Sequence, residues 1–584
     1  MGPLNAIVQR GAAACLALFV AGAGVSACAD RPVDNPRTSA PAESHPDLAA
    51  HSAQFTKGVV EVTDGVHVAI GYGLANSILI EGTDGVIIVD AMESAEAARP
   101  VKAAFDAITS KPVRAIIYTH NHADHIFGAA ILAGDDEPEV HAHATTVELI
   151  DRIANQIRPI IYRRAMRQFG TQLGPDEFVN AGIGPHLLVD DTTTPALLRP
   201  THSFTGDRTE LTIAGVRLEL VHAPGETPDQ IFVWLPDKRV LLPGDNFYHS
   251  FPNLYAIRGT ASRDVMDWVR SLDKMRALRP LHLVPSHTRP ISGVNDVLVA
   301  LINYRDAIQY VHDQTVRLMN LGLDPEVIVE RVRLPPHLAD QPYLQEYYGR
   351  VDWSVRAIFQ GYLGWFGGNA TGLGTMTHQA RAEHMVALAG GADAAHRQAA
   401  EAAANGQHQW ALELADHLRI VNPTDDDART LRIASLRALA EQELSANGRN
   451  YYLTQALEAE GLTLTPPALA DTPPEVLATF PIGAIMHALP VFLDPTKAED
   501  MHTEVGFRFP DLGESYAVFI RRGVAEIRDS FPEDPDITVI VDSQLWKEIM
   551  AQRRSALAAL AKGDLTVQGG RIAFGHFMKM FQPE

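Results

Sequence analysis

The chain has 584 residues, about twice the length at which a single hydrophobic core stops growing, so we expect two or three domains. Hydrophobic residues make up 46% and charged residues 21%, which argues against extended disorder and against a multi-span membrane protein. The formal net charge is −22, and no stretch rich in basic and aromatic residues offsets it. The composition therefore argues against nucleic acid as a partner, and an anionic small molecule would need positive charge within its pocket.

The first residues are typical of an export signal. Arg10 precedes the apolar stretch 11–25, which is short for a membrane span and ends in small residues. The segment Val25–Cys28 resembles a bacterial lipobox, in which the cysteine is lipidated, but cleavage after the small-residue run would explain it equally well. We expect residues 1–28 to be a signal peptide and the protein to be periplasmic, either free or held at the membrane by a lipid anchor.

The next segments predict a linker and then an α/β domain. Residues 29–54 begin with a proline-rich stretch and are expected to be a linker. Residues 55–315 alternate short apolar runs with helical stretches, and several predicted strands run into polar loops, where α/β folds place their chemistry. The expected strands lie within 76–92, with a hairpin turn at Asp84-Gly85, and within 112–120, 216–225, 231–245 and 281–287.

The remainder predicts two further domains. Residues 316–455 carry alanine and leucine at helical spacing, with breaks at Asn405-Gly406 and Asn422-Pro423 that suggest helical hairpins similar to tetratricopeptide units. One such pair is not a repeat array, so we interpret it as a packing or dimerisation module that predicts a homodimer. Residues 456–584 return to an α+β pattern, with helices within 475–489 and strands within 504–510, 515–529 and 537–543.

The stretch 118–129, YTHNHADHIFGA, places His120, His122, Asp124 and His125 directly after a buried strand. Imidazole nitrogen and carboxylate oxygen are ligands for Zn²⁺ and similar ions. His120 and His122 point the same way on an extended segment, while Asp124 and His125 follow on a turn. Burying these groups without a cation would cost several kcal/mol. The segment therefore predicts half of the ligands for each of two ions.

Three later loops offer the remaining ligands. Glu226 follows a Pro-Gly turn, Asp245 follows a strand, and His287 follows another strand. Each of the three, taken alone, would more often be an ordinary loop residue without an ion. Their order and spacing after the histidine cluster are what make them candidates.

This ordered set resembles the metallo-β-lactamase superfamily, which implies an α/β fold of the αββα sandwich type. The resemblance implies two Zn²⁺ ions, one held by His120, His122 and Glu226, the other by Asp124, His125 and His287, with Asp245 bridging them. It also implies that Asp90 orients a ligand histidine.

Two further stretches, 253–259 (NLYAIRG) and 347–370 (YYGRVDWSVRAIFQGYLGWFGGNA), together with Glu226, resemble the alkyl sulfatase family of the sodium dodecyl sulfate hydrolase type. That family implies a helical dimerisation domain and an α+β C-terminal domain similar to sterol carrier protein 2. It also implies that Asn253 and Arg258 hold a sulfate group. Two positions depart from the family pattern: Asp245 replaces a common glutamate, and Trp353 replaces a common histidine and would offer the substrate an apolar face.

The expected reaction is hydrolysis of an alkyl sulfate ester to an alcohol and inorganic sulfate by a metal-bound hydroxide. Asp124 would direct the nucleophile, and Arg258 would stabilise charge on the sulfate. His249 is a candidate general acid, although a lone histidine of this kind is more often structural. Two alternatives stay open: a hydrolase of another ester or lactam, and a carrier that binds lipid or detergent through its C-terminal domain.

Overall fold

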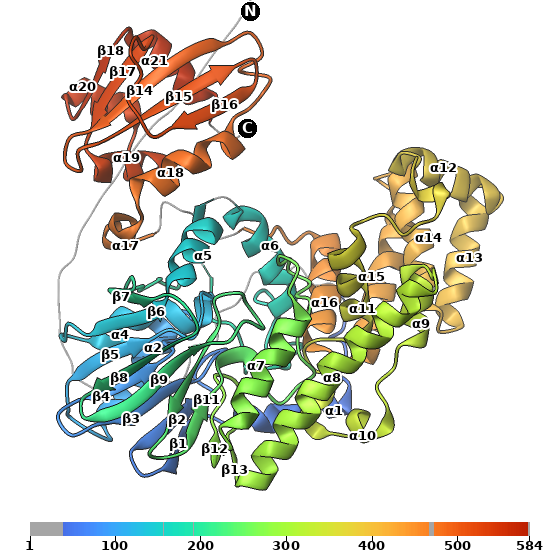
Figure 1. Cartoon of the computed structure of the whole chain (residues 1–584). Helices are drawn as coiled ribbons and strands as arrows, with labels where there is room; N and C mark the ends of the chain where they lie inside the picture. Colours follow the sequence, from blue (N-terminus) through green and yellow to red (C-terminus); the bar gives the residue numbers. More distant parts are fainter. Residues whose placement is uncertain (1–38, 156, 191, 466–471, 582–584) are drawn as a thin grey trace, which may run out of the picture.

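The computed structural model describes residues 39–581 except 156, 191 and 466–471 (Figure 1). The predicted signal peptide, residues 1–28, lies outside the described residues, and so does the first part of the predicted linker. The second part is folded, because α1 (Pro46–His51) and η1 (Ser52–Phe55) bury His51 and Phe55. Within the described part of the chain, no helix combines the length and the apolar character needed to cross a bilayer.

The first sheet has seven strands arranged in chain order. They are β1 (Gly58–Thr63), β2 (Val66–Ile70), β3 (Ser77–Glu81), β4 (Val86–Val89), β5 (Val113–Ile117), β6 (Glu139–His143) and β7 (His202–Phe204). Strands β1 to β4 are antiparallel, and β4 to β7 are parallel. The hairpin predicted at Asp84-Gly85 is confirmed as the turn between β3 and β4.

The second sheet has six strands in the order β13-β12-β11-β10-β9-β8. They are β8 (Arg208–Ile213), β9 (Val216–His222), β10 (Ile231–Leu235), β11 (Val240–Leu242), β12 (His282–Leu283) and β13 (Ile291–Ser292). Alternate residues of the two sheets, such as Ile87, Ile117, Leu220 and Val233, form one buried core between them. The sheets therefore pack face to face, as a period of two along each strand requires.

Helices cover both outer faces of this sandwich. On the first sheet lie α2 (Ala95–Asp106) and α4 (Ala129–Ala133), and on the second lie α7 (Val265–Ala277) and α8 (Val294–Asn320). The predicted αββα sandwich is confirmed. The predicted boundary at residue 315 falls inside α8, because this helix continues to Asn320 before the chain turns.

A helical domain follows, on the right in Figure 1. Its helices are α9 (Pro325–Arg331), α10 (Pro336–Ala339), α11 (Val351–Leu363), α12 (His378–Leu388), α13 (Ala392–Ala404), α14 (His408–Val421), α15 (Asp426–Gln442) and α16 (Ala446–Glu460). The predicted breaks separate α13 from α14 and α14 from α15. The predicted boundary at residue 455 falls inside α16, which packs on α6 (Arg158–Phe169) of the sandwich.

The C-terminal domain is α+β, as predicted, and lies at the top of Figure 1. Its sheet has the order β16-β15-β14-β17-β18 and comprises β14 (His502–Phe509), β15 (Glu514–Arg521), β16 (Val524–Arg528), β17 (Ile537–Val541) and β18 (Leu565–Gln568). Its helices are α17 (Pro474–Thr479), α18 (Ile482–Ala488), α19 (Ser543–Met550), α20 (Ala556–Lys562) and α21 (Arg571–Lys579). Val476 and Phe480 pack into the core outside the first sheet, which attaches this domain to the sandwich. Its similarity to sterol carrier protein 2 stays a prediction.

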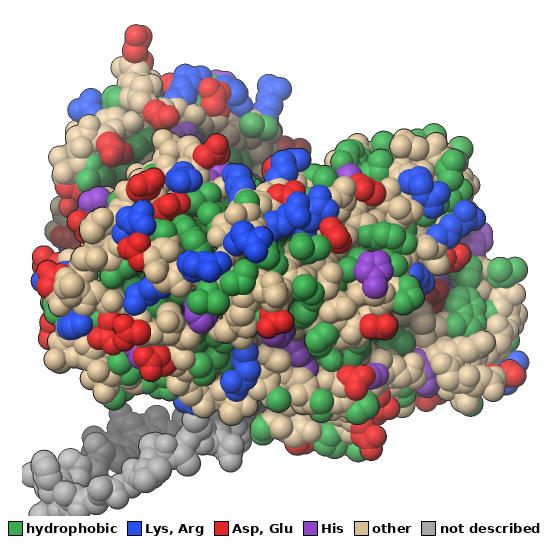
Figure 2. All heavy atoms as spheres, turned by 60° about the horizontal axis from the view of Figure 1, so that its bottom comes forward, with side chains coloured by type: hydrophobic (Ala, Val, Ile, Leu, Met, Phe, Trp, Pro, Cys, Tyr) green, Lys and Arg blue, Asp and Glu red, His purple; other side chains and the backbone are tan. Residues whose placement is uncertain are grey.

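The net negative charge is unevenly spread over the surface. On the face shown in Figure 2, Lys and Arg side chains gather in a band, with Asp and Glu side chains scattered around them. An anionic small molecule therefore meets positive charge on part of a molecule whose formal net charge is −22.

A buried ionic network ties the N-terminal segment to the helical domain. Arg437 of α15 donates to Glu177, and its guanidinium lies 3.2 Å from Glu460. Arg449 of α16 donates to the carbonyl oxygens of Glu177 and Ala42 at 2.7 and 3.0 Å. The side chains of Glu177 and Glu460 are at most 1% exposed, so removal of Arg437 leaves buried carboxylates without this cation.

We therefore expect Arg437→Met to lower the free energy of unfolding by about 3–5 kcal/mol, because breaking a buried ion pair strands a charge. Urea titration followed by circular dichroism measures the loss. Arg429→Met is the matched control on the same helix, because Arg429 pairs with Asp426, whose side chain is 80% exposed, and its loss should cost less than about 1 kcal/mol. Equal effects of the two substitutions would contradict the role of the network.

Candidate metal centre and substrate-binding residues

Strand β5 leads directly into the histidine cluster. Its apolar residues fix it between β4 and β6, and the chain then leaves the sheet at Thr119 and His120. A single helical turn, α3 (Ala123–Ile126), carries Asp124 and His125. His120 and His125 are fully buried. The strand therefore delivers these polar side chains to the end of the sandwich.

The three other predicted ligands come from loops at the same end. Glu226 follows β9 and the Pro224-Gly225 turn, Asp245 lies in η2 (Gly244–Asn246) after β11, and His287 follows β12. Gly244 has φ +60°, and a Cβ there would lie 2.0 Å from the Gln230 side chain. Only glycine therefore allows the chain to turn this tightly before Asp245.

Asp245 lies at the centre of the cluster. Its carboxylate oxygens lie 3.6 Å from His120 Nε2, 3.4 Å from His125 Nε2 and 3.2 Å from His287 Nε2. Asp124 Oδ2 lies 3.4 Å from His125 Nε2 and 3.5 Å from His287 Nε2. Three overlapping groups have ligand atoms within 4.8 Å of one another: His122, Glu226 and Asp245; His120, His125 and Asp245; and Asp124, His125 and His287. All seven predicted ligands are thus brought together.

These separations fit ligands that share a cation. Two ligand atoms at the corners of a tetrahedron with bonds of about 2.0–2.1 Å lie about 3.3–3.4 Å apart. Among the described residues, His125 Nε2, His287 Nε2 and Asp245 Oδ1 have no hydrogen-bond partner. Buried polar atoms without partners are costly, and a cation would satisfy all three. The cluster therefore has the geometry of a metal site.

Asp90 orients the cluster from behind. Its carboxylate accepts hydrogen bonds from the amide and hydroxyl of Thr119, both at 2.9 Å, from the Ser286 hydroxyl at 2.6 Å, and from His125 Nδ1 at 2.8 Å. The bond to His125 Nδ1 directs Nε2 of that ring towards Asp124 and Asp245. Asp90 itself has φ 60°, a conformation that costs free energy and that this network maintains.

Burial and neighbouring charges set the protonation states of the cluster. Burial lowers the pKa of His120 to about 3, and the neighbouring His125 adds to the effect, so the His120 ring is neutral at neutral pH. Burial alone would raise the pKa of Asp245, but His287 and His125 outweigh it and hold the pKa well below its ordinary value. Burial would lower the pKa of His125 and His287, but Asp245 and Asp124 outweigh it and raise both. Protons on these two rings therefore balance the carboxylates, and a metal ion, which binds neutral imidazole, would displace them.

Two residues that the sequence analysis missed support Glu226. The Arg263 guanidinium lies 2.8 Å from Glu226 Oε1, and the Tyr248 hydroxyl donates to Oε2 at 3.3 Å. Arg263 also donates to the carbonyl oxygen of Asn253. No local pattern marks Arg263, because its partners lie on other segments. Tyr248 is the immediate neighbour of His249, and only the loop conformation shows which of the two faces the cluster.

A third residue acts through the backbone. Glu93 is buried and accepts hydrogen bonds from the amides of Leu74 and Leu188, at 3.1 and 2.9 Å. The carbonyl of Leu74 in turn accepts from His287 Nδ1 at 2.8 Å. Glu93 therefore anchors the backbone of Leu74, whose carbonyl group sets the orientation of the His287 ring.

Arg258 and Asn253 lie beside the cluster. Arg258 Nη2 donates to His122 Nε2 at 2.9 Å, and its segment is held by Arg164, which donates to the carbonyls of Ile257 and Arg258 at 2.5 and 2.7 Å. Asn253 is 1% exposed, and neither polar atom of its side-chain amide has a hydrogen-bond partner among the described residues. A buried amide of this kind is available to a ligand.

His249 lies among aromatic side chains. Its amide donates to Thr288 Oγ1, and its ring packs edge-on against Phe247 and Tyr343. None of the contacts found among the described residues joins its ring to the metal cluster. Burial lowers the pKa of His249 to about 4, with His51 adding to the effect, so this imidazole is neutral at neutral pH. Its Nε2 has no hydrogen-bond partner among the described residues, and a general acid at His249 stays a prediction.

Trp353 also faces other neighbours. It lies on α11, where the Arg350 guanidinium is 5.1 Å from the centre of its ring. No described contact joins the ring to Arg258 or Asn253. Tyr348 of the same stretch is buried, and burial together with the nearby Glu226 raises its pKa. Tyr348 is therefore the aromatic residue of this stretch that lies near the charges of the cluster, whereas the contact found for Trp353 is with Arg350.

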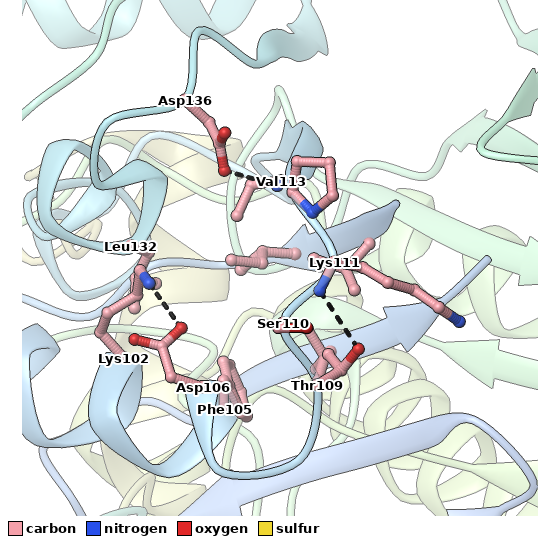
Figure 3. A pocket seen from close by; sticks show the side chains of 13 residues that line it. Lys102, Phe105, Asp106, Thr109, Ser110, Lys111, Val113, Leu132 and Asp136 are labelled. Atoms are coloured by element: carbon pink, nitrogen blue, oxygen red, sulfur yellow. Dashed lines mark hydrogen bonds and ion pairs between the residues drawn. The ribbon is translucent and has the colours of Figure 1, made fainter. Parts of the chain in front are cut away.

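A separate pocket of about 360 Å³ lies at the other end of β5 (Figure 3). Its lining includes the apolar residues Phe105 and Leu132 and the lysines Lys102 and Lys111. Lys102 pairs with Asp106, and Lys111 donates to the carbonyl of Gly82. Both lysines thus have partners, and the length of β5 lies between this pocket and the metal cluster.

Comparison with known families divides the chain into three parts. Residues 70–287 match the metallo-beta-lactamase superfamily, residues 324–461 match the family described as alkyl sulfatase dimerisation, and residues 470–584 match the family described as alkyl sulfatase C-terminal. The three matches coincide with the sandwich, the helical domain and the C-terminal domain.

Individual relatives cover nearly the whole chain. A linear primary-alkylsulfatase from a Pseudomonas species is 37% identical over 523 residues, which are 87% of this chain and 98% of the relative. An (R)-specific secondary-alkylsulfatase from a Pseudomonas species is 28% identical over 551 residues, 90% of this chain and 81% of the relative. The solved structure of a stereoselective inverting sec-alkylsulfatase from a Pseudomonas species matches with a TM-score of 0.84 and 25% identity, covering 94% of this chain and 93% of that one. The chain belongs to the alkyl sulfatase family of the metallo-β-lactamase superfamily.

Proposed function

We propose that the protein is a binuclear-metal hydrolase that cleaves alkyl sulfate esters to an alcohol and inorganic sulfate. Its relatives are named as linear primary and secondary alkylsulfatases, which supports this substrate class. The observation that carries the proposal is the presence of two side chains beside the metal cluster: the Arg258 guanidinium and the Asn253 amide, which has no hydrogen-bond partner within the described part of the chain.

These two side chains suit a sulfate monoester. Its single negative charge is spread over three oxygens, and a guanidinium presents donors in a fixed fork that matches such a group. The Asn253 amide can donate to a sulfate oxygen without losing a bond inside the protein. Arg263 holds the Asn253 backbone and Glu226 together, so the sulfate group and the metal ligands share one support.

The proposed ligands divide as the superfamily implies. His120, His122 and Glu226 would hold one ion, Asp124, His125 and His287 the other, and Asp245 would serve both. Two Zn²⁺ ions, when bound, would supply positive charge and a nucleophile derived from water at neutral pH. His125 and His287 outweigh the burial of Asp124 and keep its pKa lowered, so its carboxylate is available to accept a proton from water. Arg258 would hold the sulfate and balance its charge.

We also propose that the protein is a homodimer whose interface includes residues 362–376. This segment exposes large apolar side chains: Tyr362, Leu363, Trp365, Leu373 and Met376 are 56–74% exposed. It lies within the part of the chain that matches the alkyl sulfatase dimerisation family. Exposed apolar surface of this kind is typical of a protein–protein interface, and a second copy of the chain would bury it.

Export remains a proposal that rests on residues 1–28 alone. The apolar stretch 11–25 and the lipobox-like Val25–Cys28 support a periplasmic protein, either free or held by a lipid anchor at Cys28.

We expect Arg258→Ala to lower kcat/KM for a linear alkyl sulfate by about ten- to 150-fold, because a hydrogen bond to a charged group contributes about 1.5–3 kcal/mol. Sulfate release measures the loss, with phosphate, carboxylate and lactone esters as competing substrates. Arg258→Lys should recover part of the activity, and Arg208→Ala, on the exposed strand β8, is the control. Release of another product would favour a different hydrolase, and no release from any ester would favour a carrier.

We expect Asp90→Asn to weaken zinc binding by about 10–100-fold. Both carboxylate oxygens of Asp90 accept hydrogen bonds from Thr119, Ser286 and His125. Asparagine has one acceptor oxygen, and its amide nitrogen is a donor, so it cannot replace all of these bonds. Competition with a chromophoric chelator measures the affinity, and circular dichroism checks the fold. Asp84→Asn, in the exposed β3–β4 turn, is the control; unchanged affinity in Asp90→Asn would contradict the role of this carboxylate.

We expect Trp365→Ser to shift the protein from dimer to monomer at micromolar concentration, because the indole is 74% exposed in the single chain and would lose its apolar contact area. Light scattering after size exclusion measures the mass. Val524→Ser, at an exposed position of the C-terminal domain with 60% exposure, should leave the mass unchanged. A dimer that tolerates Trp365→Ser would exclude this segment as its main contact.

A further inference from the structure

A second group of potential metal ligands lies at the edge of the first sheet. Glu139 and His141 belong to β6, and His202 belongs to the edge strand β7. The parallel register places His141 opposite His202, and Glu139 precedes His141 by two residues on the same face. Val140 and Ala142, which alternate with Glu139 and His141 along β6, face the helices outside the sheet. The three side chains therefore project together on the opposite face.

Their separations suit one cation. One ligand atom from each of the three residues lies within 4.8 Å of the other two. His141 Nε2 lies 3.0 Å from Glu139 Oε2, and the centres of the His141 and His202 rings are 5.1 Å apart. His202 Nδ1 is hydrogen-bonded to Thr201 Oγ1 at 3.0 Å, which fixes the ring, and Nε2 has no hydrogen bond to any residue that the structure describes. Because both strands are held in the sheet, no loop has to be ordered on binding.

The chemistry of the three groups is that of a transition-metal site. Burial lowers the pKa of His141 even though the Glu139 carboxylate opposes it, so this imidazole is neutral and can bind a cation at neutral pH. Glu139 and His202 are exposed, so an ion can reach the group from solvent. Two imidazoles and one carboxylate leave further positions for water, and such a donor set selects Zn²⁺, Ni²⁺ or Cu²⁺ over Mg²⁺ or Ca²⁺.

Neighbouring histidines on this face are engaged elsewhere. His143 stacks on His222 with ring centres 4.0 Å apart, and His222 Nε2 lies 2.8 Å from the carbonyl oxygen of Pro228. They are not part of any group of ligand atoms found among the described residues. The site is therefore limited to Glu139, His141 and His202, none of which belongs to the catalytic cluster.

We propose that Glu139, His141 and His202 bind one additional divalent transition-metal ion at the open edge of the sandwich. The ion is held by three protein ligands and water, so its affinity is lower than that of a cluster in which every ligand is buried.

The test is metal stoichiometry of the full protein. After removal of metal with chelator, the wild type and His202→Ala are dialysed against increasing zinc, and bound metal per chain is measured by mass spectrometry. We expect His202→Ala to bind one equivalent fewer at saturation, and Glu139→Gln to require a higher zinc concentration. His378→Ala, which removes an exposed histidine from α12, is the matched control and should bind as the wild type does.

Equal stoichiometry of His202→Ala and wild type would overturn the proposal. Sulfate release by His202→Ala should equal that of the wild type, because His202 has no place in the catalytic cluster. The difference between wild type and His202→Ala reports only on the edge site, whereas the equivalents that remain in His202→Ala report on the catalytic cluster. Failure of one proposal is thus distinguishable from failure of the other.

Discussion

The metal centre depends on one buried carboxylate. Asp90 accepts hydrogen bonds from Thr119, from His125 and from Ser286, which precedes His287, so it holds two of the ligand-bearing segments to the end of β4. Asn76 adds a second tie, because its amide group donates to the carbonyl oxygens of Pro285 and Thr288. Ligands that lie far apart in the sequence can share an ion only if their segments are fixed to within a fraction of an ångström, and these bonds supply that precision.

The electrostatics of the site follow from its burial. Carboxylates from Asp90, Asp124, Glu226 and Asp245 are gathered where little water reaches them, and Arg263 pairs directly with Glu226. Such a concentration of negative charge is unfavourable in a low dielectric unless cations accompany it. The same cations and Arg258 would provide the positive field that an anionic ester needs in a strongly acidic protein. Metal binding and substrate attraction are therefore two consequences of one charge distribution.

Residues from several elements of the fold hold the loop that carries Asn253 and Arg258. Arg164 of α6 fixes the carbonyls of Ile257 and Arg258, Arg263 fixes Asn253, and α16 packs against α6 from the helical domain. The helical domain therefore contacts the catalytic sandwich through the helix that holds the Arg258 segment. An exposed apolar segment of this domain, residues 362–376, begins at the end of α11, within the region matched by the dimerisation family.

The sequence alone indicated the α/β class and the three-part organisation, because strand periodicity and helix breaks are local patterns, and the dense cluster at 120–125 marked four candidate ligands. Glu226, Asp245 and His287 became candidates through their order along the chain and the resemblance to the metallo-β-lactamase superfamily. Only the tertiary structure decided how these residues meet. Arg263, Tyr248 and Glu93 have no local signature, since each acts on a segment distant in the sequence. His249 and Trp353 showed the reverse: both lie in motifs near the site, yet their side chains pack against Tyr343 and Arg350. Sequence proximity places a backbone near a site, whereas the direction of a side chain depends on the packing of the whole fold.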